Sequence, residues 1–279
     1  MELSILLKLK CLNLEMTFNL ETVPEKLIYG FSRLQVLRMG WTGFDASRAI
    51  NGNISFSRLE CLECLKYLNA LTITMCNDSA LEGFLSSHRL QGCTEGLCID
   101  RRRDDSLFSQ KTLCLPPMKR LQYLSLESTS MEEVKIEWEE EGRKIQTPYV
   151  FQTSVIASKR NFYNLWMVYV SSCTNLEDIT WIIWAPNLRN LTVSDCRRMK
   201  EIIKLKSIHR FAFSFPCLDV IEIVHCPKLR KIPLSRNSAK GRRIIIREAQ
   251  QWWNELEWED ERMNPHGARF SRHSKFFKN

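Results

Sequence analysis

Thiols and carboxylates are the groups in this sequence with the clearest potential for chemistry. The pair Cys61-Leu-Glu-Cys64 has the spacing of a zinc-binding or redox motif. No second pair at zinc-finger spacing accompanies it, and its leucine-rich, helical surroundings favour core packing. Glu139, Glu140 and Glu141 could bind a hard cation, but consecutive carboxylates converge only in a tight loop, so we interpret them as a solvated run. The sequence predicts neither a metal site nor a cofactor.

Motifs for nucleotide binding and catalysis are absent from the sequence. It has no Gly-Lys dipeptide, which excludes a phosphate loop, and no G-x-G-x-x-G. None of its histidines is followed by Glu, which excludes the H-E-x-x-H motif, and no G-x-S-x-G elbow occurs. We therefore expect a protein without enzymatic activity.

The composition is that of a globular chain, with 44% hydrophobic and 26% charged residues in 279. No window approaches about 18 consecutive apolar residues, the length that a transmembrane helix needs. The eleven cysteines are odd in number and no secretion signal precedes them, so we expect reduced thiols. These features predict an intracellular, cytoplasmic protein, with any membrane association made through partners.

Positive charge is concentrated at the C-terminal end. Residues 236–279 contain 10 Lys and Arg against 6 Asp and Glu, which is half of the formal net charge of +8. A basic tail can bind nucleic acid or phospholipid, but chain ends are more often solvated and poorly ordered. We predict a disordered tail and no nucleic-acid partner.

An internal repeat decides the expected fold. The segment Leu165-x-x-Val168-x-Val170-x-x-Cys173 recurs 23 residues later from Leu188, and 30 residues after that from Leu218. This is the leucine-rich-repeat pattern, with Cys where Asn is more usual. Weaker copies begin upstream, which gives about nine repeats in all; their first residues are Leu9, Leu34, Leu68, Thr94, Leu121 and Met131.

The alternation of apolar residues in each repeat predicts a short strand with one buried face. One repeat cannot bury that face alone, so neighbouring repeats must stack as a parallel sheet. The predicted fold class is therefore α/β, a leucine-rich-repeat solenoid with a curved parallel sheet on the concave face and an irregular or short-helical convex side. Cys173, Cys196 and Cys226 follow their strands, and we interpret these thiols as structural.

The domain prediction has three parts. Residues 1–235 form the solenoid, with loop insertions near 43–57 and 137–152. Residues 236–261 form a further strand and a Trp-rich capping helix, because a solenoid needs its open end covered. Residues 262–279 form the basic tail.

Contacts with partners are expected on the outward-facing residues of the strands. Among them Tyr123, Tyr169 and Arg38 are favoured, because Tyr and Arg are common at interface centres. The complete set of candidate contacts on the concave face is Val36, Arg38, Tyr123, Ser125, Glu133, Lys135, Met167, Tyr169, Asn190, Thr192, Val220 and Glu222.

Two C-terminal stretches carry a specific resemblance to a known family. The segment from Cys173 to Ile203 and the segment Cys226-Pro-Lys-Leu-Arg-Lys-Ile-Pro-Leu resemble the last repeats of plant disease resistance proteins, the coiled-coil class of nucleotide-binding leucine-rich-repeat receptors. The resemblance implies an intracellular receptor module. Its partners would be a pathogen effector or a guarded host protein, and the receptor's nucleotide-binding domain, which the repeats would restrain.

The sequence departs from that family in lacking the coiled coil and the nucleotide-binding domain. It is therefore expected to be a fragment or a truncated gene product. The alternative is a free-standing leucine-rich-repeat adaptor, such as the substrate-recognition unit of a ubiquitin ligase, or a decoy.

Overall fold

The computed structural model has an α/β fold with a mostly parallel sheet and few, short helices, as the sequence predicts. The chain divides into two compact units, one of residues 1–107 with 123–125 and the other of residues 108–122 with 126–279. The residues that the structure describes are 8–17, 25–40, 59–100, 111–140, 143–146, 162–204, 215–232, 244–247 and 270–272.

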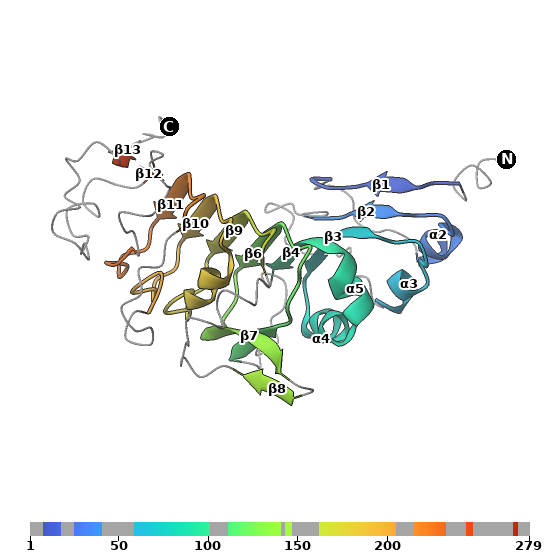
Figure 1. Cartoon of the computed structure of the whole chain (residues 1–279), viewed down its shortest axis with the longest axis horizontal. Coiled ribbons are helices and arrows are strands. Elements are labelled where there is room, and N and C mark those ends of the chain that lie inside the picture. The colour runs from blue at the N-terminus through green and yellow to red at the C-terminus, as the bar shows by residue number, and fades with distance from the viewer. Residues whose placement is uncertain are drawn as a thin grey trace. The chain divides into compact units, whose positions relative to one another are not determined.

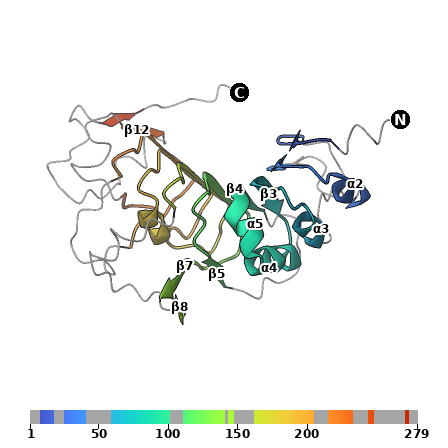
Figure 2. The same ribbon diagram turned by 45° about the vertical axis from the view of Figure 1, so that its right-hand side comes forward.

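Parallel strands form the sheet of the first unit (Figure 1), in the order β1 (Cys11–Asn13), β2 (Val36–Arg38), β3 (Ala70–Met75) and β4 (Thr94–Asp100). Next in the order comes β6 (Tyr123–Glu127), whose first three residues belong to this unit. The helices lie on one side of these strands (Figure 2); they are α2 (Glu25–Gly30), α3 (Glu60–Glu63), α4 (Asp78–Ser86) and α5 (His88–Cys93).

Apolar residues at matching positions set the register of the first unit. Leu37 pairs with Leu12 on one side and with Leu71 on the other, and Leu37 and Leu71 are fully buried. Helix α4 begins where the Asn77 side chain accepts a hydrogen bond from the backbone N–H of Ala80 at 2.8 Å. The connecting segments of these repeats differ, but their strands contribute leucines at matching positions to the same buried layer.

The second unit contains the most regular repeats. Its parallel strands are β9 (Met167–Ser171), β10 (Asn190–Ser194), β11 (Val220–Val224), β12 (Ile244–Arg247) and β13 (Phe270–Arg272), in that order. Each residue of β10 has a partner in both β9 and β11, without a register shift. The 3-10 helix η1 (Thr180–Trp184), which follows β9 in the chain, is buried throughout.

A separate sheet corrects two predictions from the sequence. It contains β5 (Thr112–Leu115), β7 (Glu133–Glu140) and β8 (Arg143–Gln146), with β7 parallel to β5 and antiparallel to β8. The repeat predicted from Met131 is therefore not a rung of the long sheet. The charged stretch from 137, predicted as a loop insertion, continues β7 and turns back as β8, because the alternation of Val134, Ile136 and Trp138 suits a strand.

Other predicted segments are only partly described. The loop insertion near 43–57 lies outside the described residues, as does the predicted capping helix after β12. Strand β12 itself lies within 236–261, where a further strand is expected. Strand β13 lies within 262–279, where the sequence predicted a disordered tail, and it pairs in parallel with β12. Among the described residues, no helix has the length and apolar character to cross a membrane.

Candidate functional site

The cysteines after the strands form a buried row in the second unit. Cys173, Cys196 and Cys226 are each at most 2% exposed. Each thiol can donate a hydrogen bond to a main-chain oxygen in the strand of the repeat before its own. The Sγ···O distances are 3.5 Å from Cys173 to Leu126, 3.9 Å from Cys196 to Val170 and 3.7 Å from Cys226 to Val193. Their burial and these contacts agree with the interpretation of the cysteines as structural.

Protonation keeps the central thiol of this row, that of Cys196, in its donor state. Hydrogen bonds with the thiols of Cys173 and Cys226, together with burial, raise the pKa of Cys196. Cys61 of the Cys-x-x-Cys pair is buried in the core, whereas Cys64 is exposed. All eleven cysteines are among the described residues, and none is in a disulfide. In the part of the chain that the structure describes, no three His, Cys, Asp or Glu side chains are grouped so that they could hold a metal ion.

A tight turn precedes each cysteine of the row and fixes how the strand ends. Ser172, Asp195 and His225 have φ values of 54°, 53° and 51°, the left-handed conformation that non-glycine residues rarely adopt. The N–H of Ser172 donates to the carbonyl of Ser194 at 2.9 Å, and that of Asp195 donates to Val224 at 2.8 Å. The turns at Ser172 and Asp195 are therefore held to the next repeat, so side chains at equal positions line up.

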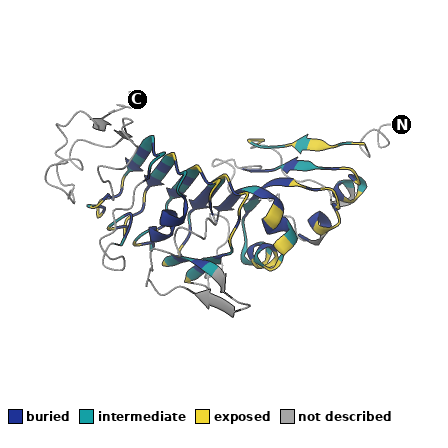
Figure 3. Cartoon of the chain, in the orientation of Figure 1, coloured by how far each residue is buried: buried dark blue, intermediate teal, exposed yellow. Residues whose placement is uncertain are grey.

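The predicted contact residues of β9 to β11 lie together on one side of the sheet. Inward residues such as Val168 and Val170 are fully buried, and the residues between them are partly exposed, an alternation visible in Figure 3. The register aligns them in two rows across the three strands; these are Met167, Asn190 and Val220, and Tyr169, Thr192 and Glu222.

The predicted contacts on β2 and β6 are less available. Val36 and Arg38 are partly exposed, and the Arg38 guanidinium pairs with the Glu95 carboxylate at 3.3 Å. Ser125, predicted to project outward for a partner, is completely buried. The prediction for Ser125 is wrong, because so short a side chain does not extend past the groups around it.

Tyr123 is held within its own unit. A Cβ added at Gly96 would lie 2.0 Å from the Tyr123 ring, and one at Gly40 would lie 2.3 Å from its hydroxyl, so two glycines make room for this side chain. The hydroxyl donates to Glu15 Oε1 at 3.4 Å, and Thr72 donates to the same oxygen at 2.6 Å. Burial is the main cause that raises the pKa of Tyr123. Tyr123 is partly exposed but makes internal contacts, so its role as a contact for a partner stays a prediction.

Glu133 and Lys135 are also misplaced by the sequence prediction. Both lie on β7 in the separate sheet rather than on the long one. Their side chains form an ion pair with each other at 2.9 Å. They cannot extend the rows formed by β9 to β11.

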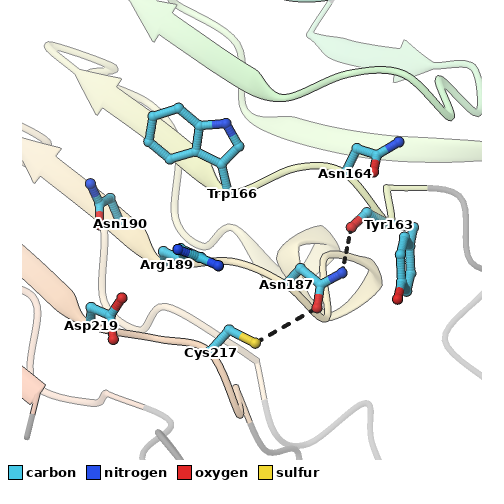
Figure 4. Close-up of a pocket in the computed structure, with 8 residues that line it drawn as sticks. All are labelled: Tyr163, Asn164, Trp166, Asn187, Arg189, Asn190, Cys217 and Asp219. Carbon is cyan, nitrogen blue, oxygen red and sulfur yellow. Dashed lines mark hydrogen bonds between the residues drawn. The ribbon is translucent and has the colours of Figure 1, made fainter. Parts of the chain in front are cut away.

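Sequence reasoning missed an open depression where the chain enters β9, β10 and β11. It has a volume of about 670 Å³, and Figure 4 shows Trp166, Arg189 and Asp219 on three successive segments. Each of these residues directly precedes its strand, outside the alternation used to select outward positions. The complete lining is Tyr163, Asn164, Trp166, Asn187, Arg189, Asn190, Cys217 and Asp219.

Hydrogen bonds between repeats hold the walls of the depression. The Asn187 amide donates to the carbonyl of Tyr163 at 2.7 Å, and its oxygen accepts from Cys217 at 3.7 Å. The Asn164 amide donates to a carbonyl of the repeat before it at 2.7 Å. Trp166 is 38% exposed and Tyr163 is 43% exposed. A fixed framework thus presents aromatic and guanidinium groups, which are enriched at the energetic centres of protein interfaces.

Known proteins with sequences similar to this chain are described as disease resistance proteins. No family model matches the chain. A putative disease resistance protein of Arabidopsis thaliana is 29% identical over 89% of this chain, and the Arabidopsis disease resistance proteins RPS5 and SUMM2 are 30% and 29% identical over 84% and 81%. The matches cover 30%, 28% and 27% of these relatives, so the chain spans less than a third of their length. Over most of its residues the chain is similar to part of a plant disease resistance protein.

Proposed function

We propose that this chain is a leucine-rich-repeat solenoid that serves as a protein-interaction module in plant defence. It acts by binding, without catalysis, cofactor or metal. The in-register strands and the thiol row support the solenoid, since both recur with the sequence repeat. The similarity to Arabidopsis disease resistance proteins supports the role in defence.

The receptor would be a cytoplasmic one of the coiled-coil, nucleotide-binding class. In it the module would recognise a pathogen effector or a guarded host protein, and would restrain the nucleotide-binding domain until recognition occurs. Both roles need a contact surface of defined shape.

The depression before β9 to β11 is the observation that carries the proposal. Trp166 and Tyr163 keep large aromatic groups exposed beside Arg189, on walls tied by side-chain hydrogen bonds. Burying such groups against a partner removes apolar surface from water, which lowers the free energy of the complex. Because the walls are already ordered, binding does not carry the entropy cost of ordering a loop. The outward rows of the same strands extend the available surface.

The test uses the complete protein encoded by the gene that contains this sequence, produced in leaf cells of a pathogen-resistant plant. Trp166→Ala combined with Arg189→Ala is compared with Tyr67→Ala combined with Arg33→Ala. The control pair also removes an exposed aromatic and an exposed arginine, but away from the depression. We expect the first pair to abolish pathogen-triggered cell death, or to make it constitutive if the depression contacts the nucleotide-binding domain, while the control pair leaves it intact.

Equal responses from wild type and both variants, at equal protein levels, would contradict the role of the depression. If the complete protein proves to contain a ligase-recruiting helix pair in place of a nucleotide-binding domain, the adaptor function replaces the receptor function.

A further inference from the structure

The turns after β10 and β11 carry a concentration of positive charge. Arg197, Arg198 and Lys200 follow β10 and Lys228 follows β11, and all four are exposed. We call these four residues the basic turn surface. The aligned six-residue turns 173–178, 196–201 and 226–231 have net charges of −2, +2 and +3, so the charge changes sign along the stack of repeats.

Backbone hydrogen bonds stack these turns in register. The N–H of Lys200 donates to the carbonyl of Glu177 at 3.0 Å, and the N–H of Arg230 donates to that of Lys200 at 3.0 Å. Residues at equal positions therefore form columns across the turns. With repeats about 4.8 Å apart, neighbouring basic groups in a column are close enough to share one anion.

In two of these columns, Asn175–Arg198–Lys228 and Glu177–Lys200–Arg230, the first step is complementary and the second brings two cations together. Arg198 donates to Asn175 Oδ1 at 3.3 Å, and the Lys200 ammonium pairs with the Glu177 carboxylate at 2.9 Å. In the next repeat, Lys228 stands at the position equal to Arg198. Arg198 therefore has the amide of Asn175 on one side in its column and a second cation on the other. Like charges in one column repel each other, and an anionic partner removes that repulsion.

The effect of this charge is visible on a neighbouring carboxyl group. The hydrogen bond from Lys200 lowers the pKa of Glu177, with Lys204 and Arg198 contributing in the same direction. Glu177 is exposed to solvent, and the basic groups around it favour its ionised form.

We propose that the basic turn surface binds an acidic segment of a partner protein. The large hydrophobic side chains exposed among the described residues are Met16, Tyr29, Tyr67, Tyr163 and Trp166, and these turns contain none of them. The surface therefore offers neither the aromatic platform that single-stranded nucleic acid uses nor the apolar anchor that strengthens binding to a membrane. The carboxylates of an extended acidic peptide can pair with these basic groups through charge alone. The surface lies at the opposite ends of the strands from the depression and does not depend on it.

The test measures fluorescence anisotropy of a labelled ten-residue glutamate peptide with the full chain at about 50 mM salt. We expect saturable binding that Arg197→Glu combined with Lys228→Glu weakens at least about tenfold, and that about 500 mM salt abolishes. Both residues are exposed, and circular dichroism melts check that the variant folds as wild type does. The control, Lys10→Glu combined with Lys66→Glu, makes the same change in net charge at exposed sites of the first unit, and should change the affinity less than about threefold.

Three results would overturn the proposal. They are absence of saturable binding at about 50 mM salt, equal weakening by the control, and stronger binding to phosphatidylserine vesicles or to a ten-nucleotide single strand than to the peptide. None of them bears on the depression, so failure here is distinguishable from failure of the proposed function.

Discussion

The outward face of the sheet is used differently in the two units. In the first unit it is occupied by internal contacts, since Tyr123 lies against Gly96 and shares the Glu15 carboxylate with Thr72. In the second unit the outward rows on β9 to β11 stay partly exposed, while backbone pairing and the buried cysteines connect the same strands.

The difference follows from the regularity of the repeats. Strands β9, β10 and β11 pair without a register shift, so the same backbone bonds and thiol contacts recur from one repeat to the next. Between β3 and β4 the register shifts at Leu71 and Thr72, and side chains from distant repeats meet across that part of the face. The outward side chain of Tyr123 in the irregular unit is thus engaged in contacts between repeats, whereas the outward rows of the regular repeats follow one another in register.

The largest expected effect tests the separation of inward and outward residues in the regular unit. Leu191 is 2% exposed on the inward side of β10, and Thr192 is the next, outward residue. Leu191→Ala should lower the free energy of unfolding by about 2–5 kcal/mol, because it leaves a cavity in the core. Thr192→Ala should lower it by less than about 1 kcal/mol. Urea denaturation of both variants checks this, and equal losses would refute the contrast between the two faces.

The sequence predicted the regular repeats well because their signal is local and redundant. Leu188, Leu191, Val193 and Cys196 each have a counterpart in the repeats that contain β9 and β11, and all are buried in the structure. The segment from Met131 has the same local alternation, but which strand it pairs with is decided by tertiary packing that the pattern does not encode.

The misses at the candidate site have related causes. Trp166 and Arg189 precede their strands, so the alternation of inward and outward residues says nothing about them. Tyr123 fitted the outward pattern, but the two glycines that receive it are far away in the sequence, at positions 40 and 96. The pattern of a single repeat does not show which residues form a site between repeats. It also does not show which residues of distant repeats come into contact.

A smaller effect is expected from filling the space under Tyr123. Gly96→Ala places a Cβ about 2 Å from the ring and should lower the free energy of unfolding by about 1–3 kcal/mol through overpacking. Combining it with Tyr123→Ala should remove most of that additional loss, because the clashing ring is gone.

Gly92→Ala is the matched control in the same unit. A Cβ at Gly92, in helix α5, would meet no atom within 4 Å, so alanine should raise the stability by about 0.5–1 kcal/mol. If Gly96→Ala proves as harmless as Gly92→Ala in thermal melts, the irregular unit does not depend on its outward contacts, and the comparison between the units fails.

The smallest effect isolates the Tyr123 hydroxyl. Tyr123→Phe removes the bond to Glu15 and should lower the free energy of unfolding by about 0.5–1.5 kcal/mol near neutral pH.

Since the pKa of Tyr123 in the folded protein lies above its ordinary value of 10.0, the unfolded chain loses the phenol proton first as the pH rises. The stability that comes from keeping Tyr123 neutral is therefore complete below pH 10 and is lost progressively above it. Urea denaturation between about pH 8 and pH 11 should show a steeper loss for wild type than for Tyr123→Phe, because both proteins share every other titrating group. Parallel curves would mean that the hydroxyl is as well solvated in the folded unit as in the unfolded chain, and that the outward face of the first unit is open like that of the second.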